Sequence, residues 1–106
     1  MVIIMEFYHG TTTAFGKLGI ILPPDETGVE REIRSKKITN MVYITPSSLS
    51  AARYAKKAAD KFGGEPIIYK VKPMGRYYSL INNEWVTDRA RVIGIEEFKR
   101  TEVKVK

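Results

Sequence analysis

The sequence predicts a small α+β domain with one main helix and mostly antiparallel strands. Three observations lead to this prediction. Short apolar segments recur between turn-forming residues, one alanine-rich stretch has helical periodicity, and 106 residues are enough for a single core only. A hydrophobic content of 43% is ordinary for a globular protein. We therefore treat residues 1–106 as one domain.

The first strand is expected at residues 2–8, an apolar run that ends beside His9, the single histidine of the chain. Gly10 follows, and glycine lets a backbone approach a ligand closely, so this strand end is a candidate binding site. The alternative is that His9 bonds a neighbouring carbonyl and that Gly10 only makes a turn. Residues 12–16 then predict a short turn or helix, and residues 19–22 a brief extended segment.

Residues 23–40 begin with two prolines and are mostly charged or turn-forming. This composition predicts either a mobile loop or one amphipathic helical turn on the surface. So long a connection in a small domain is typical of a functional flap or of a disordered excursion.

The main helix is expected after a strand at residues 41–44. Thr45 is the expected N-terminal cap, with Pro46 in the first turn, and Gly63 ends the helix after Phe62. An apolar stripe at helical spacing should face the sheet. Its members are Ala51, Ala52, Ala55, Ala58, Ala59 and Phe62.

The hydroxyl-bearing residues Ser47, Ser50 and Tyr54 fall on the adjacent flank of this helix. That flank borders the core, so it either contributes to a polar site or forms an ordinary amphipathic boundary.

The C-terminal half predicts further strands. They are expected at residues 66–72, 84–86, 90–95 and 101–105, with the first closed by residues 73–75 and a loop at residues 76–83. Glu84 stands at the start of one of these strands. An acid there faces either a polar cleft or, at a sheet edge, water.

Composition narrows the function. A net charge of +6 favours a polyanionic ligand or partner, such as a nucleotide pyrophosphate, a nucleic acid or an acidic protein surface, although simple solubility explains it equally well. The absence of cysteine excludes disulfides, thiolate zinc sites and cysteine nucleophiles, and one histidine argues against a histidine-rich metal centre, so we expect no metal.

No run approaches the roughly 20 apolar residues of a membrane span, and the N-terminal run is too short for a signal peptide. We therefore expect a cytoplasmic protein with no membrane partner.

Three segments, in this order, resemble the motifs of the ADP-ribosyltransferase superfamily. They are Tyr8-His9-Gly10-Thr11, Val42-Tyr43-Ile44-Thr45 with the helix from Ser47 to Tyr54, and Asn83-Glu84-Trp85-Val86. The eleven-residue spacing of Tyr43 and Tyr54 is similar to that of the poly-ADP-ribose polymerase and diphtheria-toxin branch. The chain also resembles the small rifamycin-modifying enzymes.

The resemblance implies two short, mostly antiparallel sheets that form a split cleft, in which NAD binds as co-substrate. It implies that His9 bonds a ribose hydroxyl and that the Gly10 backbone, with Thr11 beside it, holds the nicotinamide carboxamide. Tyr43 and Tyr54 would enclose the nicotinamide ring, and such stacking is sensible because an aromatic face attracts a cation.

The same resemblance makes Glu84 the catalytic carboxylate, with His9 and Tyr43 completing the catalytic set. Glu84 would bind the ribose 2′-hydroxyl, stabilise the oxocarbenium-like state as nicotinamide leaves, and accept a proton from the nucleophile. Ala51 stands where the family's carboxamide-binding serine is expected, so Ser47 or Ser50 must take that role.

The acceptor stays open between a protein, a nucleic acid and a small molecule, and the enzyme would be a toxin, a phage effector or a small-molecule modifier. Asn82 lies two positions before Glu84, where arginine-modifying members carry an acid, which disfavours an arginine acceptor. One alternative with the same fold is an RNA 2′-phosphotransferase, which needs arginines around a phosphate. Another is a non-catalytic nucleotide- or nucleic-acid-binding module in which tyrosines stack on bases beside basic side chains.

Overall fold

The computed structural model describes residues 5–23, 41–81 and 84–98. In these residues one α-helix and a short 3-10 helix accompany five strands, all paired antiparallel, which confirms the α+β class. The elements in chain order are β1 (Phe7–Thr12), η1 (Thr13–Phe15), β2 (Ile20–Ile21), β3 (Val42–Ile44), α2 (Ser48–Phe62), β4 (Pro66–Ser79) and β5 (Trp85–Glu96).

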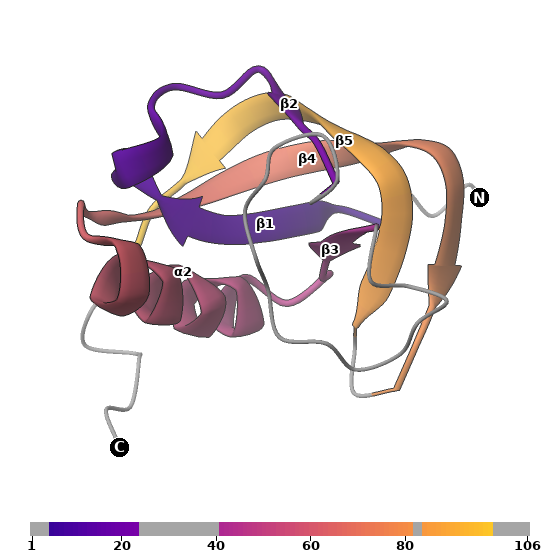
Figure 1. Ribbon diagram of the computed structural model, residues 1–106. Coiled ribbons are helices and arrows are strands. Elements are labelled where there is room, and N and C mark those ends of the chain that lie inside the picture. The colour runs from indigo at the N-terminus through magenta and orange to yellow at the C-terminus, as the bar shows by residue number, and fades with distance from the viewer. Residues whose placement is uncertain (1–4, 24–40, 82–83, 99–106) are drawn as a thin grey trace.

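The strands form one sheet that curls back on itself. The order is β1-β4-β5-β2, and β3 pairs with β5 beside β2. Immediately after β3, Thr45 forms an isolated bridge with Tyr8 of β1, through hydrogen bonds of 2.7 and 3.0 Å between their backbones. The sequence β1-β4-β5-β3-β1 therefore closes a small barrel-like ring, around which β4 and β5 curve as one long hairpin (Figure 1).

The expected division into two sheets is wrong for the described residues, because β5 joins both halves. This strand of twelve residues pairs with β3 through residues 85–87 and with β2 through residues 90–91, while its other edge pairs with β4. The sequence analysis placed two separate strands in this stretch. Asp88 and Arg89 between them have low strand preference, but ladder pairing on both edges overrides it.

Two further strand predictions need correction. His9 lies inside β1 and not at its end, since the pairing with β4 continues through the β-branched residues Thr11 and Thr12. Residues 76–79 belong to β4 and not to a loop. The β4 strand passes Gly75 by a bulge, with positive φ at this glycine and a register shift between Met74 and Tyr77.

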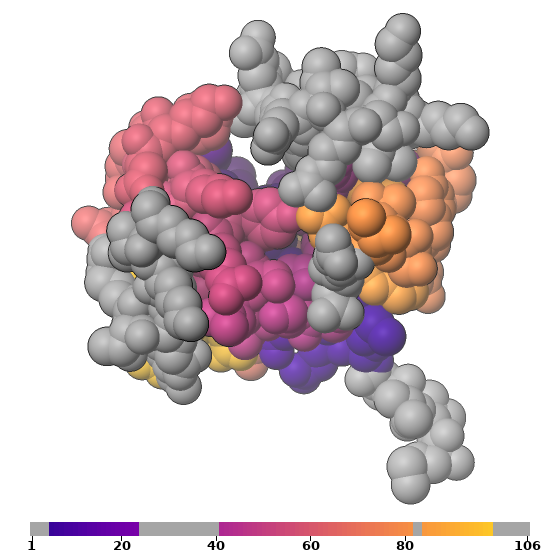
Figure 2. All heavy atoms as spheres, turned by 90° about the horizontal axis from the view of Figure 1, so that it is seen from below, coloured from indigo at the N-terminus to yellow at the C-terminus, as the bar shows by residue number. Residues whose placement is uncertain are grey.

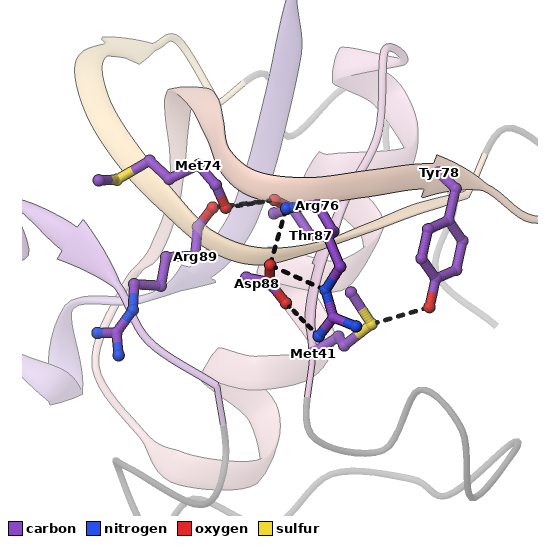
Figure 3. A network of polar contacts seen from close by, with 7 residues as sticks. All are labelled: Met41, Met74, Arg76, Tyr78, Thr87, Asp88 and Arg89. Carbon is purple, nitrogen blue, oxygen red and sulfur yellow. Dashed lines mark hydrogen bonds and ion pairs between the residues drawn. The ribbon is translucent and has the colours of Figure 1, made fainter.

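A polar network fixes the bulge between β4 and β5 (Figure 3). The carboxylate of Asp88 accepts from the backbone N–H of Arg76 at 2.7 Å and from Nε and Nη2 of its guanidinium at 3.2 and 2.9 Å. The hydroxyl of Thr87, which is fully buried, lies 3.1 Å from the carbonyl oxygens of Met74 and Arg89. These contacts hold the end of the hairpin that carries Glu84.

Helix α2 packs across β1 and β4 on the outer face of the ring (Figure 1). Ala51, Ala52 and Ala55 of the predicted stripe are buried against Tyr8 and Ile68. The other three members are not: Ala58 and Ala59 are half-buried, and Phe62 is exposed. Phe62 instead packs against Phe15 of η1 with the rings tilted and their centroids 5.1 Å apart, and Gly63 has the expected positive φ. The predicted N-cap, Thr45, lies two residues before the observed one: Ser47 caps the helix, and Thr45 forms the bridge to Tyr8.

The main core lies on the inner face of the ring. It consists of Phe7, Ile21, Val42, Ile44, Tyr69, Val71 and Ala90. A smaller cluster on the other face of β3 and β5 contains Met41 and Val86, with Tyr43 and Leu80 packed against it. Alternate residues of β3 thus serve two different faces, which leaves the side chain of Tyr43 outside the main core.

Residues 24–40 and the strand expected at 101–105 lie outside the described residues, as do residues 2–4 of the first predicted strand. Among the residues that are described, no helix has the length and apolar character needed to cross a bilayer.

Candidate functional site

His9 contacts the second predicted motif directly. Its Nδ1 lies 2.8 Å from the backbone carbonyl oxygen of Tyr43. A carbonyl oxygen can only accept, so Nδ1 carries a proton, and in the neutral form of the ring Nε2 is the acceptor atom. The bond defines both the tautomer and the ring orientation of His9.

Gly10 has a packing role that the sequence analysis did not anticipate. A Cβ atom at this position would lie 1.8 Å from the carbonyl oxygen of Ala51 and 2.8 Å from the backbone nitrogen of Ala55. The absence of a side chain therefore allows α2 to lie directly on β1. The neighbouring residue Thr11 is buried, with 6% of its surface exposed.

Tyr43 and Glu84 lie close together in the chain order of the β3–β5 ladder. Tyr43 is the pairing partner of Val86, and directly paired residues point to the same side. Glu84 stands two positions before Val86, immediately before β5 begins at Trp85. Both Tyr43 and Glu84 are half-buried.

Tyr54 and Glu84 are in direct contact. The hydroxyl of Tyr54, on α2, donates to Oε1 of Glu84 at 2.7 Å. This hydrogen bond joins the helix to the end of the β4–β5 hairpin, across 30 residues of sequence. Glu84 thus has a part-buried polar contact on the side of α2.

Ser47 and Ser50 both lie at the start of α2, but their local roles differ. Oγ of Ser47 accepts from the backbone N–H of Ser50 at 3.1 Å, which is the contact of a helix N-cap. Ser47 is thus committed to the helix start, and Ser50 is the better of the two candidates for a ligand contact.

The motif residues come from neighbouring elements. His9 and Tyr43 belong to β1 and β3, which lie side by side through the Tyr8–Thr45 bridge. In Figure 2 the magenta atoms of α2 lie beside the orange atoms of the β4–β5 hairpin. The hydrogen bond between Tyr54 and Glu84 joins α2 to the end of this hairpin.

Tyr8 and Asp88, which are not among the candidate site residues, have shifted pKa values. Burial, with Glu6 next to the hydroxyl, raises the pKa of Tyr8 above its ordinary value. Hydrogen bonds from Arg76 lower the pKa of Asp88. No group of three or more His, Asp or Glu side chains suited to a metal ion occurs in the part of the chain that the structure describes.

Sequence reasoning missed the role of Tyr78, which lies in the stretch expected to be a loop. Tyr78 pairs with Val86 from the β4 side, as Tyr43 does from the β3 side, so the three residues form a row across the sheet. The Tyr78 hydroxyl lies 3.2 Å from Sδ of Met41 (Figure 3). The only signal for this strand was the β-preference of the adjacent Tyr77 and Tyr78.

Comparison with known proteins adds no assignment: a scan of the chain against protein-family models matches no family, and a search of the curated proteins finds no significant relative.

Proposed function

We propose that this protein is an NAD-dependent ADP-ribosyltransferase. The observation that carries the proposal is the convergence of three distant segments. His9 bonds to the backbone of Tyr43, Tyr54 bonds to Glu84, and Tyr43 pairs with Val86, two residues after Glu84. These are the residues for which the sequence resemblance implies contact with NAD.

The chemistry of these groups suits the nicotinamide half of NAD. His9 offers Nε2 as an acceptor for a ribose hydroxyl, and the ring of Tyr43 offers an aromatic face to the cationic nicotinamide. The basic net charge of +6 suits the pyrophosphate. Ser50, at the start of α2, is the candidate to bond the carboxamide.

Glu84 is the catalytic residue in this proposal. The glycosidic bond between ribose C1′ and the nicotinamide nitrogen breaks, and nicotinamide leaves with the bonding electron pair. The carboxylate stabilises the positive charge that develops on the ribose, as in glycoside hydrolysis. The acceptor nucleophile then forms a bond to C1′ and gives up its proton, for which Glu84 is the available base.

The test is nicotinamide release from NAD, followed by proton NMR, for the wild type and Glu84→Gln. We expect the variant to lose release by about 100-fold or more while its NAD affinity changes little, because the charge matters most in the transition state. Glu97→Gln is the matched control, since Glu97 is exposed and lies beyond β5.

Three results would contradict the proposal. One is equal release by Glu84→Gln and the wild type, and another is no release together with no NAD-induced spectral change. Removal of a 2′-phosphate from RNA in the presence of NAD would instead identify the phosphotransferase reaction.

A further inference from the structure

We propose that Tyr54 is a positioning residue: its hydroxyl holds the catalytic carboxylate of Glu84 in the orientation that cleavage of NAD requires. This inference rests on the proposed function and goes beyond the role in which Tyr54 only stacks on the nicotinamide ring. The two parts of the Tyr54 side chain then have different roles: the ring can contact the ligand, and the hydroxyl contacts Glu84.

The hydrogen bond itself has the geometry of a strong contact. The distance between the Tyr54 hydroxyl oxygen and Oε1 of Glu84 is 2.7 Å, which is the usual distance for a hydroxyl donor and lies within the range for an ionised carboxylate acceptor. Tyrosine has only two side-chain torsions, so ordering its hydroxyl costs less conformational entropy than ordering a long flexible donor.

The donor side of this contact is rigidly placed. Tyr54 lies between Ala51 and Ala55, both of which are fully buried against β1 and β4. The Gly10 backbone meets the Ala51 carbonyl so closely that not even a methyl group would fit between them. The helix therefore has no room to move toward β1, and the height of the Tyr54 ring above the sheet is determined by backbone packing.

The acceptor side is anchored through its main chain. Glu84 closes the hairpin loop: its carbonyl accepts from the N–H of Leu80 at 2.7 Å, and its own N–H donates to the carbonyl of Ile81 at 3.2 Å. The glutamate side chain adds three rotatable bonds beyond this anchored backbone. The hydroxyl of Tyr54, on a second and rigid element, contributes to the selection of one orientation of the carboxylate.

The contact leaves the carboxylate able to work. An ionised carboxylate offers about four acceptor positions on two oxygens, and the Tyr54 hydroxyl occupies one of them. The Tyr54 bond therefore does not by itself fill the acceptor capacity of Glu84, and in the proposed function the ribose 2′-hydroxyl binds the same carboxylate. Orientation of a reacting group within a fraction of an ångström is a recognised source of catalytic rate, so the bond should act on kcat.

The experiment compares Tyr54→Phe with Tyr54→Leu. Tyr54→Phe keeps the aromatic ring and removes only the hydroxyl, so we expect kcat for nicotinamide release to fall roughly 10- to 100-fold while the KM for NAD stays within about threefold. Tyr54→Leu also removes the ring and should lower kcat and raise KM together. Tyr77→Phe is the matched control, because the Tyr77 ring packs on Phe7 and Trp85 on the inner face of the sheet, away from Glu84.

Each outcome decides the inference. A lower kcat at unchanged KM in Tyr54→Phe supports the positioning role, provided that this variant melts at the same temperature as Tyr77→Phe. A kcat equal to that of the wild type in Tyr54→Phe would overturn the positioning role and leave the proposed function intact. A raised KM at unchanged kcat would also overturn it, because it assigns the hydroxyl to ligand binding. A wild type that releases no nicotinamide would overturn the proposed function and this inference with it.

Discussion

The imidazole Nδ1 of His9 lies 2.8 Å from the carbonyl oxygen of Tyr43, so a side chain of β1 donates a hydrogen bond to the backbone of β3. In the proposed function, Nε2 of the neutral ring accepts from a ribose hydroxyl. We expect His9→Ala to weaken NAD binding by about 10-fold, the equivalent of one lost hydrogen bond, as measured by calorimetric titration. Unchanged affinity in a folded variant would remove His9 from the NAD site.

Gly10 has a structural reason to be glycine that needs no ligand. Because a methyl group there would lie 1.8 Å from the Ala51 carbonyl oxygen, Gly10→Ala must push α2 away from β1. We expect a loss of about 1–3 kcal/mol in the free energy of unfolding, or roughly 5–20 °C in melting temperature.

Gly19→Ala is the control for this prediction, since nothing lies within 4 Å of a Cβ at that position. If Gly10→Ala melted like the wild type and lost only NAD binding, the close packing of helix on strand would be wrong and the ligand role of Gly10 would remain.

The two serines at the start of α2 should separate stability from binding. Ser47→Ala removes the N-cap acceptor and is expected to cost about 1 kcal/mol of stability. Ser50→Ala keeps the cap, because Ser50 contributes only its backbone N–H to it, and should lower NAD affinity instead. Chemical denaturation and NAD titration of both variants test this, and the reverse pattern would assign the carboxamide contact to Ser47.

Local patterns in the sequence were sufficient for much of the fold. The alanine stripe and the two glycines after Phe62 predicted α2, whose observed span is Ser48–Phe62. Strands β2 and β3 fall within the predicted segments. These elements are determined by nearby residues, namely helical periodicity, a C-terminal glycine and short apolar runs between turns.

The failures share one cause, which is pairing between distant segments. The glycine after His9 and the polar residues in the middle of β5 carry no strong strand signal, yet ladder bonds with β4 make both stretches extended. The bulge at Gly75 was interpreted as a strand end, because a glycine in an isolated sequence looks the same in a turn and in a bulge.

The candidate site shows the same division. The residues of the three motifs could be selected from the sequence, but the contact of Tyr54 with Glu84 could not, since it depends on where α2 lies relative to the hairpin end. The packing role of Gly10 could not be predicted either, because the carbonyl oxygen that it accommodates belongs to Ala51, forty-one residues further along the chain.

The ion pair at the β4 bulge predicts a pH dependence of stability with a definite sign. Hydrogen bonds from Arg76 hold the pKa of Asp88 below its ordinary value of 3.8. A carboxyl whose pKa is lowered in the folded state stabilises the fold above the pKa of the unfolded chain, and this contribution is lost as the pH falls through the lower, folded value. Asp88→Asn should therefore melt a few degrees at most below the wild type at pH 7, because the Arg76 side chain is 79% exposed, and the gap should close in acid.

Thermal melts of the wild type, Asp88→Asn and Arg76→Ala from pH 7 down into the acid range measure this dependence. Arg76→Ala breaks the same pair from its other side, so its stability should lose the acid-dependent part that the wild type shows near and below pH 3.8. A gap between the wild type and Asp88→Asn that stayed constant throughout the acid range would show that the charge of Asp88 contributes nothing. The loss would then belong to the shape of the bulge alone, where the Asp88 carboxylate fills the space beside Gly75.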